Sequence, residues 1–289
     1  MKKSLFLLWV MFLGAIIPQA SAFSDLIFYG LIAILFFAFL EEKLEKKIFY
    51  EKRVVFILLA NIFVWFLAYF IVNPYNPDLA FILFLVWITP TATAAPGVIS
   101  ILGWKINFVI ASVLFTNIFM AFAWPFFFQY TGYWDIEVFP VLIATLKVIM
   151  IPLLVAQLFH YIFPKGRTFI VSKFKFLSFY IWLGVIFLAI SKASDFISSQ
   201  SQIWFFDILV VFIGVAVLCL FNFVFWKFIG GKEYALESSQ SLGQKNTIFS
   251  TWVALQFFTP MIALWPIFYI VLHNLYNAYL LYKNKNKLD

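Results

Sequence analysis

The chain has 289 residues, of which 65% are hydrophobic and 11% charged, and its mean hydropathy is +1.00. A soluble domain cannot bury that much apolar surface, so the composition predicts an all-α integral membrane protein in which residues 1–289 form a single domain. The lone cysteine, Cys219, excludes an internal disulfide and a multi-cysteine metal site. We expect no cofactor.

The N-terminal segment Met1–Ala22 has two interpretations. A Met-Lys-Lys start, an apolar run over Leu5–Ile17 and the tripeptide Ala20-Ser-Ala22 are typical of a secretory signal peptide. The alternative is a first membrane helix that stays attached. Cleavage after Ala22 would leave nine spans, whereas two equal halves need ten. We therefore expect the segment to be retained.

Apolar runs predict uninterrupted spans along most of the remaining chain, at about Leu26–Leu40, Val54–Val72, Asn107–Gln129, Val138–Phe163, Phe169–Ile190, Ile203–Ile229 and Met261–Tyr282. One further span is interrupted. The apolar pieces Leu79–Thr89 and Val98–Leu102 are separated by the stretch Pro90–Gly97, whose two prolines and glycine forbid a regular helix. This is the fourth predicted span, and it is broken.

A second interruption lies in the ninth predicted span. The polar stretch Glu237–Thr247 separates the apolar runs Tyr234–Leu242 and Ile248–Phe258. Neither run reaches the ~20 residues that cross a bilayer as one helix. Gly243 marks the break. A lysine and a polar backbone at this depth are tolerated only when they are buried in protein or line a wet cavity.

The spacing of the two breaks predicts an internal repeat. The fourth and ninth of ten spans are five positions apart, as expected for two five-helix repeats of opposite topology, about residues 1–130 and 135–285. The two halves share no convincing residue identity, so the breaks alone carry this inference.

Basic residues predict the orientation. Most of the 20 Lys and Arg residues lie in alternate loops, among them the charged loop Glu41–Arg53. By the positive-inside rule, both termini of this multi-pass chain face the cytoplasm, in the cell (inner or plasma) membrane. The net charge of +7 is then topological, so we expect the lipid bilayer and not nucleic acid as a partner. The oligomeric state stays open, and a monomer is consistent with the sequence.

Four pieces of the sequence, taken in their order and spacing, resemble the bile acid:sodium symporter family. They are the Pro90–Pro96 break, Lys147-x4-Pro152-x7-His160, Gly243-Gln-Lys-Asn246 and Pro266…His273-Asn274. The resemblance covers most of the chain. It implies a panel and a core domain, with the broken fourth and ninth helices crossing at mid-membrane, and transport of organic anions, often with sodium.

Helix ends at such a crossing suit charged solutes. Positive half-helix ends attract carboxylates, and freed carbonyls bind cations. The candidate substrate-binding residues are Thr91, Thr93, Lys147, Lys245, Asn246, Thr247, His273 and Asn274. The competing interpretation is structural: the small polar residues satisfy the backbone at two kinks, Lys147 snorkels, and His273 and Asn274 bond between helices.

The resemblance also implies an ion site, and there the sequence departs from the family. The candidate ion-binding residues are Asn61, Ala95, Pro96, Ser112, Thr116, Glu237, Ser241 and Gln244. Ala95 and Pro96 stand where the family has Ser-Asn. Ser241 and Lys245 stand where it has Glu and Gln. Two hypotheses follow: Lys245 replaces a coupling cation, or it is neutral in the empty site and becomes charged when an anion binds.

The sequence thus predicts a secondary active transporter of an organic anion, with Na⁺ as a possible but doubtful coupling ion. The first alternative is a membrane receptor or scaffold that has this fold and does not transport. A membrane-embedded enzyme is disfavoured, because the sequence holds no His-Glu-x-x-His motif and no pair of aspartates inside a span. We expect no enzymatic activity.

Overall fold

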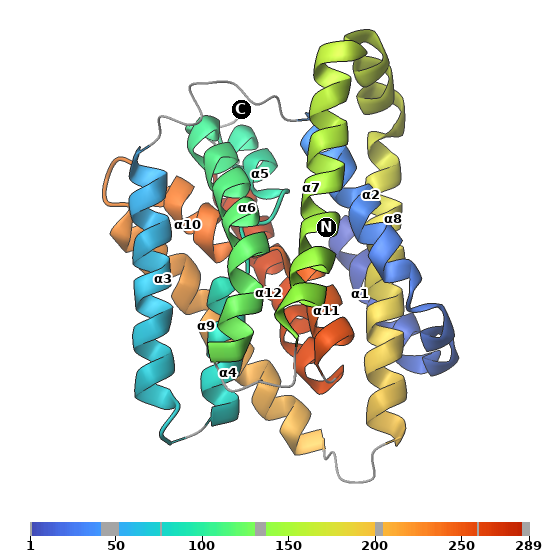
Figure 1. Ribbon diagram of the computed structural model, residues 1–289, viewed down its shortest axis with the longest axis vertical. Coiled ribbons are helices and arrows are strands. Elements are labelled where there is room, and N and C mark those ends of the chain that lie inside the picture. The colour runs from blue at the N-terminus through green and yellow to red at the C-terminus, as the bar shows by residue number, and fades with distance from the viewer. Residues whose placement is uncertain are drawn as a thin grey trace. The chain divides into compact units, whose positions relative to one another are not determined.

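The computed structural model is helical, apart from turns and one isolated β-bridge, over the residues that it describes: 2–41, 52–75, 77–130, 137–199, 205–258 and 260–284 (Figure 1). The basic loop residues 42–51 and the C-terminal residues 285–289 lie outside this set. The helices are α1 (Lys2–Ile16), the 3₁₀ helix η1 (Pro18–Phe23), α2 (Leu26–Glu41), α3 (Lys52–Val72), α4 (Pro77–Ile88), α5 (Ala95–Ile101), α6 (Ile106–Tyr130), α7 (Val138–Ile162), α8 (Pro164–Ser199), α9 (Phe205–Ile229), α10 (Ala235–Gly243), α11 (Thr247–Phe257) and α12 (Pro260–Lys283).

Several helices are long and apolar enough to cross a membrane. Within the described ranges there are five, over Lys52–Val72, Ile106–Ala123, Phe139–Ile162, Phe176–Ser199 and Ile208–Ile229. Leu26–Glu41 and Thr247–Phe257 are shorter apolar helices. Large side chains such as Phe139 and Phe228 are 74% and 81% exposed, which suits a surface that faces lipid. The chain is therefore an all-α, membrane-embedded protein. The ten spans and the inverted repeats stay predictions.

Both predicted helix breaks are present. α4 ends at Ile88 and α5 begins at Ala95. Pro96 lies in the first turn of α5, where its missing N–H costs nothing. α10 ends at Gly243 and α11 begins at Thr247. Two linkers result, residues 89–94 and residues 244–246, and together we call them the linker pair.

One helix is much longer than predicted. α8 runs over Pro164–Ser199, whereas the apolar run predicted only Phe169–Ile190. Its polar C-terminal part is stabilised by the N-terminal segment: Ser191 Oγ donates to the carbonyl of Ile17, and Ser194 Oγ donates to that of Ala15, at 2.7 Å. Hydropathy alone does not detect a helix extension whose partners lie far away in sequence.

The chain divides into two compact units, and each unit takes segments from both halves of the sequence. The first unit comprises Met1–Leu44, Ile143–Val211 and Ile248–Ile267. In it, α1 and α2 pack along α8 (Figure 1). The contact of α1 needs a glycine, because a Cβ on Gly14 would lie 2.7 Å from the Phe187 carbonyl oxygen; a Cβ on Gly30 of α2 would lie 2.5 Å from a Val185 methyl, which would have to move.

The second unit comprises Glu45–Leu142, Phe212–Thr247 and Phe268–Asp289. In it, α3 packs against α4 and α6, and α6 also contacts α5 and α10 (Figure 1). Aromatic rings fill the space between α3 and α4: the rings of Trp65 and Phe84, both fully buried, are 4.6 Å apart. The entire linker pair belongs to this unit.

Candidate functional site

The two linkers pair with each other through their backbones. Thr91 and Lys245 form an antiparallel bridge. On its two sides, Ala92 N–H donates to the Gln244 carbonyl and Asn246 N–H donates to the Pro90 carbonyl, each at 2.8 Å. Backbone groups that lose their helical partners at the two breaks thus satisfy one another. The prediction that the two breaks meet is confirmed.

Carbonyls at the C-terminal end of α4 lose their helical donors at the break. In a continuous helix the carbonyls of Val86 and Trp87 would accept from residues 90 and 91. Residue 90 is a proline and has no N–H, and Thr91 N–H donates instead to Thr116 Oγ1, at 2.9 Å. The Trp87 carbonyl therefore needs donors from outside its own helix.

Two side chains supply those donors. Asn61 Nδ2 from α3 and Lys245 Nζ from the second linker each lie 3.1 Å from the Trp87 carbonyl oxygen. Lys245 is fully buried. Its Nζ lies at the C-terminal end of α4, the negative end of the helix dipole, where a positive charge would be stabilised.

One asparagine on α6 contacts both linkers. Asn117 Nδ2 donates to the Thr91 carbonyl at 3.1 Å, and Asn117 Oδ1 accepts from Asn246 Nδ2 at 3.4 Å. Thr91 Oγ1 donates to the carbonyl of Ser241 in the last turn of α10. Side chains of the linkers and of α6 thus fix the distance between the two breaks.

Gly243, the last residue of α10, is held by α9 and α12. Tyr269 Oη donates to the Gly243 carbonyl at 2.7 Å and accepts from Asn222 Nδ2 at 3.3 Å. A Cβ on Gly243 would lie 2.5 Å from the Phe223 ring, so only glycine fits here. Close packing, and not a positive φ, explains this glycine.

α10 has a buried polar face. Glu237 and Ser241 lie one turn apart on α10, Gln244 is the first residue of the linker that follows, and each is at most 3% exposed. Glu237 Oε2, Ser241 Oγ and Gln244 Oε1 have no hydrogen-bond partner among the described residues. Buried oxygens of this kind normally bind a water, an ion or a ligand. The predicted ion-binding residues of this span therefore do provide oxygens without donors.

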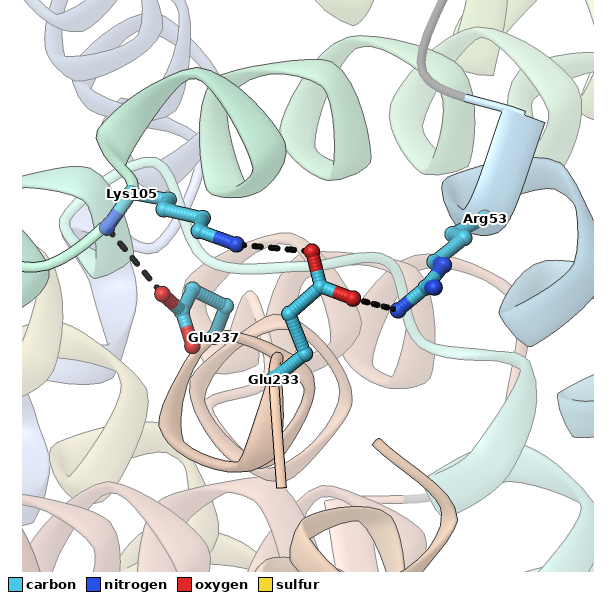
Figure 2. A network of polar contacts seen from close by, with 4 residues as sticks. All are labelled: Arg53, Lys105, Glu233 and Glu237. Carbon is cyan, nitrogen blue, oxygen red and sulfur yellow. Dashed lines mark hydrogen bonds and ion pairs between the residues drawn. The ribbon is translucent and has the colours of Figure 1, made fainter. Parts of the chain in front are cut away.

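Charged groups cluster at the N-terminal end of α10 (Figure 2). The Glu233 carboxylate pairs with Arg53 Nη1 at 2.8 Å and with Lys105 Nζ at 3.0 Å. Lys105 N–H donates to Glu237 Oε1 at 3.0 Å. Both cations also lie over the Tyr234 ring, with the Arg53 guanidinium 4.7 Å and Lys105 Nζ 4.0 Å from its centroid. This charge cluster joins α3, the turn before α6 and the start of α10.

The ion pair shifts two pKa values in opposite directions. The hydrogen bond from Lys105 lowers the pKa of the Glu233 carboxyl below its ordinary value, and the nearby Arg53 charge adds to the effect. The same bond from Glu233 raises the pKa of the Lys105 ammonium. Both groups therefore stay charged throughout the physiological range.

The hydroxyls predicted on α6 bond their own helix. Ser112 Oγ donates to the Phe108 carbonyl at 3.1 Å, and Thr116 Oγ1 donates to the Ser112 carbonyl at 2.6 Å. This is the usual behaviour of Ser and Thr in membrane helices. Thr116 nevertheless reaches the linker pair, since its oxygen accepts from Thr91 N–H.

The predicted residues at the start of α5 are mostly buried. Ala95 and Pro96 are buried and open the helix, and Thr93 is half-buried in the turn before it. The carbonyls of the first residues of a helix accept bonds from the next turn. Ala95 and Pro96 therefore offer a cation less than the end of α4 does.

The remaining candidates lie at different distances from the linkers. Thr247 is buried, and its N–H donates to the Lys245 carbonyl at 2.9 Å. His273 is buried on α12, and its Nδ1 has no partner within the described part of the chain. Asn274 Nδ2 donates within its own helix, to Ile270. Lys147 is exposed on α7 and belongs to the first unit, whereas the linkers belong to the second.

Three residues that the sequence did not point to hold this site: Asn117 contacts the linkers, and Asn222 and Tyr269 hold the end of α10. A usable signal existed for the two asparagines, because a buried amide inside an apolar span needs a nearby partner. Tyr269 gave no such signal, since tyrosine is common in membrane helices.

These features define an all-α membrane protein in which two broken helices meet in a buried, polar, hydrogen-bonded site. No protein-family model and no curated protein matches the chain. The resemblance to bile acid:sodium symporters thus depends on the four sequence pieces.

Proposed function

We propose that this protein is a secondary active transporter of a carboxylate-type organic anion, which works by alternating access around the linker pair. The observation that carries the proposal is the fully buried side chain of Lys245 between two broken helices. A buried charge without a carboxylate partner is costly, and a substrate anion would offset that cost. The proposal includes ten spans in two inverted repeats, with a panel and a core domain as the resemblance implies, and cytoplasmic termini in the cell membrane.

In this proposal the substrate carboxylate binds beside the linkers. Lys245 supplies the charge, and Asn246, Thr247, Thr91 and Thr93 supply hydrogen bonds. His273 and Asn274 would contact the rest of the solute. The alternative is that Na⁺ is the coupling ion. The Glu237, Ser241 and Gln244 oxygens without donors would then be its ligands, and NaCl should stabilise the wild type itself.

Counterflow in liposomes tests the proposal. The purified full-length chain is reconstituted, the vesicles are loaded with one unlabelled carboxylate, and entry of its labelled form is followed for a panel of carboxylates. We expect at least one to exchange faster than in protein-free vesicles. Asn246→Ala should slow that exchange about tenfold, since it removes a polar contact to the solute. Thr168→Ala, on an exposed hydroxyl that bonds only its own helix, is the control.

A receptor or scaffold without transport activity is the second candidate. The hydrogen bonding of the linker pair favours it. The N–H groups of Ala92 and Asn246 already pair with the opposite linker, and that of Thr91 pairs with Thr116. Such a protein would bind a carboxylate, seen as a thermal shift, and give no counterflow. Binding without exchange across the whole panel would reject the transporter.

A further inference from the structure

We propose that Lys245 is a tethered cation: its ammonium fills a monovalent-cation site at the C-terminal end of α4, and removing the ammonium opens that site to free Na⁺. This inference rests on the proposed function and deepens it, because a cation site already filled by Lys245 would leave no place there for a coupling Na⁺. It stands on local geometry, and its test does not require transport.

The acceptor of the Lys245 side chain is a carbonyl at the end of a half-helix. The Trp87 carbonyl has lost its helical donor and lies at the negative end of a half-helix. Ends of this kind, with carbonyls freed by a break, are where membrane transporters coordinate cations. Here the place is taken by Nζ, 3.1 Å from the oxygen.

Lys245 takes part in none of the ion pairs found among the described residues. Lys245 is fully buried, and the ion pairs found among the described residues involve Arg53, Lys105 and Glu233 but not Lys245. Glu237, two helical turns earlier in sequence, uses one oxygen to accept the backbone N–H of Lys105. The ammonium thus has a neutral oxygen ligand, as a bound alkali cation would have.

The position of Lys245 is fixed by its backbone. The backbone of Lys245 is held by the bridge to Thr91 and by the bonds that Gln244 and Asn246 make on either side. The ammonium therefore cannot leave as an ion does at the end of each cycle. It can only stay or move with the linker.

Asn61 is placed to supply a replacement ligand. Asn61 donates to the same carbonyl as the ammonium, which places its amide directly beside the ammonium. Its Oδ1 has no donor among the described side chains and backbone. Once Nζ is gone, half a turn of this amide exchanges Nδ2 for Oδ1. Oxygens from Trp87 and Asn61 would then face the vacated position.

Thermal unfolding of the purified full-length protein tests the idea, in NaCl and in choline chloride at equal concentration. The wild type should unfold at the same temperature in both salts. Lys245→Gln removes the charge and adds an oxygen, and NaCl should raise its midpoint by about 2–6 °C in a saturable way. Lys165→Gln, on an exposed lysine, is the matched control and should not respond. Equal midpoints of Lys245→Gln in both salts, or a wild type stabilised by Na⁺ as strongly as the variant, would overturn the proposal.

A second variant keeps the idea testable if Lys245→Gln does not fold. Asn61→Asp adds a carboxylate beside the Trp87 carbonyl and leaves Lys245 in place. If Nζ fills the cation site, it pairs with the new carboxylate and keeps free Na⁺ out, so the variant should unfold at the same temperature in NaCl and in choline chloride. A midpoint raised by NaCl would show that Na⁺ enters although Nζ is present, which refutes a tethered cation.

The two proposals fail separately. Absence of counterflow with a sodium response in Lys245→Gln would reject transport and keep the cation site. Counterflow that requires Na⁺ in the wild type, together with a Na⁺-dependent wild-type midpoint, would keep transport and reject the tethered cation.

Discussion

At the scale of single residues, the linkers are held by amides and carbonyls more than by charges. Asn117 contacts both linkers, and the Trp87 carbonyl accepts from two different segments. Such groups are worth most where water is absent, because a lost partner leaves a buried polar atom unpaired. The polar residues of the linkers were predictable from the sequence, and their partners were not. A carbonyl oxygen has no sequence signature, and Asn117 became important only once Thr91 lay opposite it.

The charge cluster makes stability depend on pH. The pKa of Glu233 is lowered by Lys105, so its contribution is present above the carboxyl's unfolded-state pKa and is lost as pH falls through the folded one. Lys105, with a raised pKa, keeps its contribution until pH rises through its folded pKa. We expect the unfolding midpoint to decrease on acidification, and to decrease less in Glu233→Gln.

The measurement is a series of thermal unfolding curves from neutral to acid pH for the wild type and Glu233→Gln. Asp25→Asn, which neutralises another exposed carboxylate, is the control. Added salt should narrow the difference between wild type and variant, because exposed ion pairs are screened. Parallel pH curves for all three proteins would show that the cluster adds nothing to stability.

At the scale of elements, helix existence was predictable and helix contacts were not. Apolar runs located nearly every helix, and prolines and Gly243 located both breaks, because these residues act through local backbone chemistry. Hydropathy did not predict the C-terminal part of α8, because its stability depends on hydrogen bonds from Ser191 and Ser194 to the carbonyls of Ile17 and Ala15, at the end of α1. The predicted signal-peptide-like segment is thus packed and bonded against α8 in this structure.

Packing of α1 against α8 gives a prediction at this scale. A leucine at Gly14 would drive its Cβ into the Phe187 carbonyl, so Gly14→Leu should separate the two helices and lower the unfolding midpoint. The expected cost is about 1–3 kcal/mol. Gly214→Leu, on α9, meets nothing within 4 Å and is the matched control. Thermal unfolding of both variants in the same detergent decides. A Gly14 variant as stable as the Gly214 variant would mean that α1 does not need its close contact.

At the scale of the whole molecule, each compact unit combines early and late segments of the chain. Composition and hydropathy predicted a helical membrane protein, since these are bulk properties. They did not predict which segments share a unit, because that is decided by side-chain contacts between distant parts of the sequence.

Orientation can be measured directly. Basic loops predict that the start of α8 faces the cytoplasm and that its end faces outward. In intact cells a membrane-impermeant maleimide should therefore label Ser198→Cys, whereas Lys165→Cys should react only after lysis; both positions are exposed. The native Cys219 is buried and serves as the unlabelled background. The reverse labelling pattern would invert the proposed topology.

Pairing of the linkers also has a consequence for how the protein is made. Thr91 and its partner Ser241 are 150 residues apart. At a synthesis rate of about 5–20 residues per second, the first linker is made about 8–30 s before the segment with which it pairs. During that interval the unpaired backbone N–H and C=O groups of the first linker need other hydrogen-bond partners, which water or the insertion machinery would supply. Slow ribosomes should therefore harm assembly of this protein more than that of a membrane protein with unbroken helices.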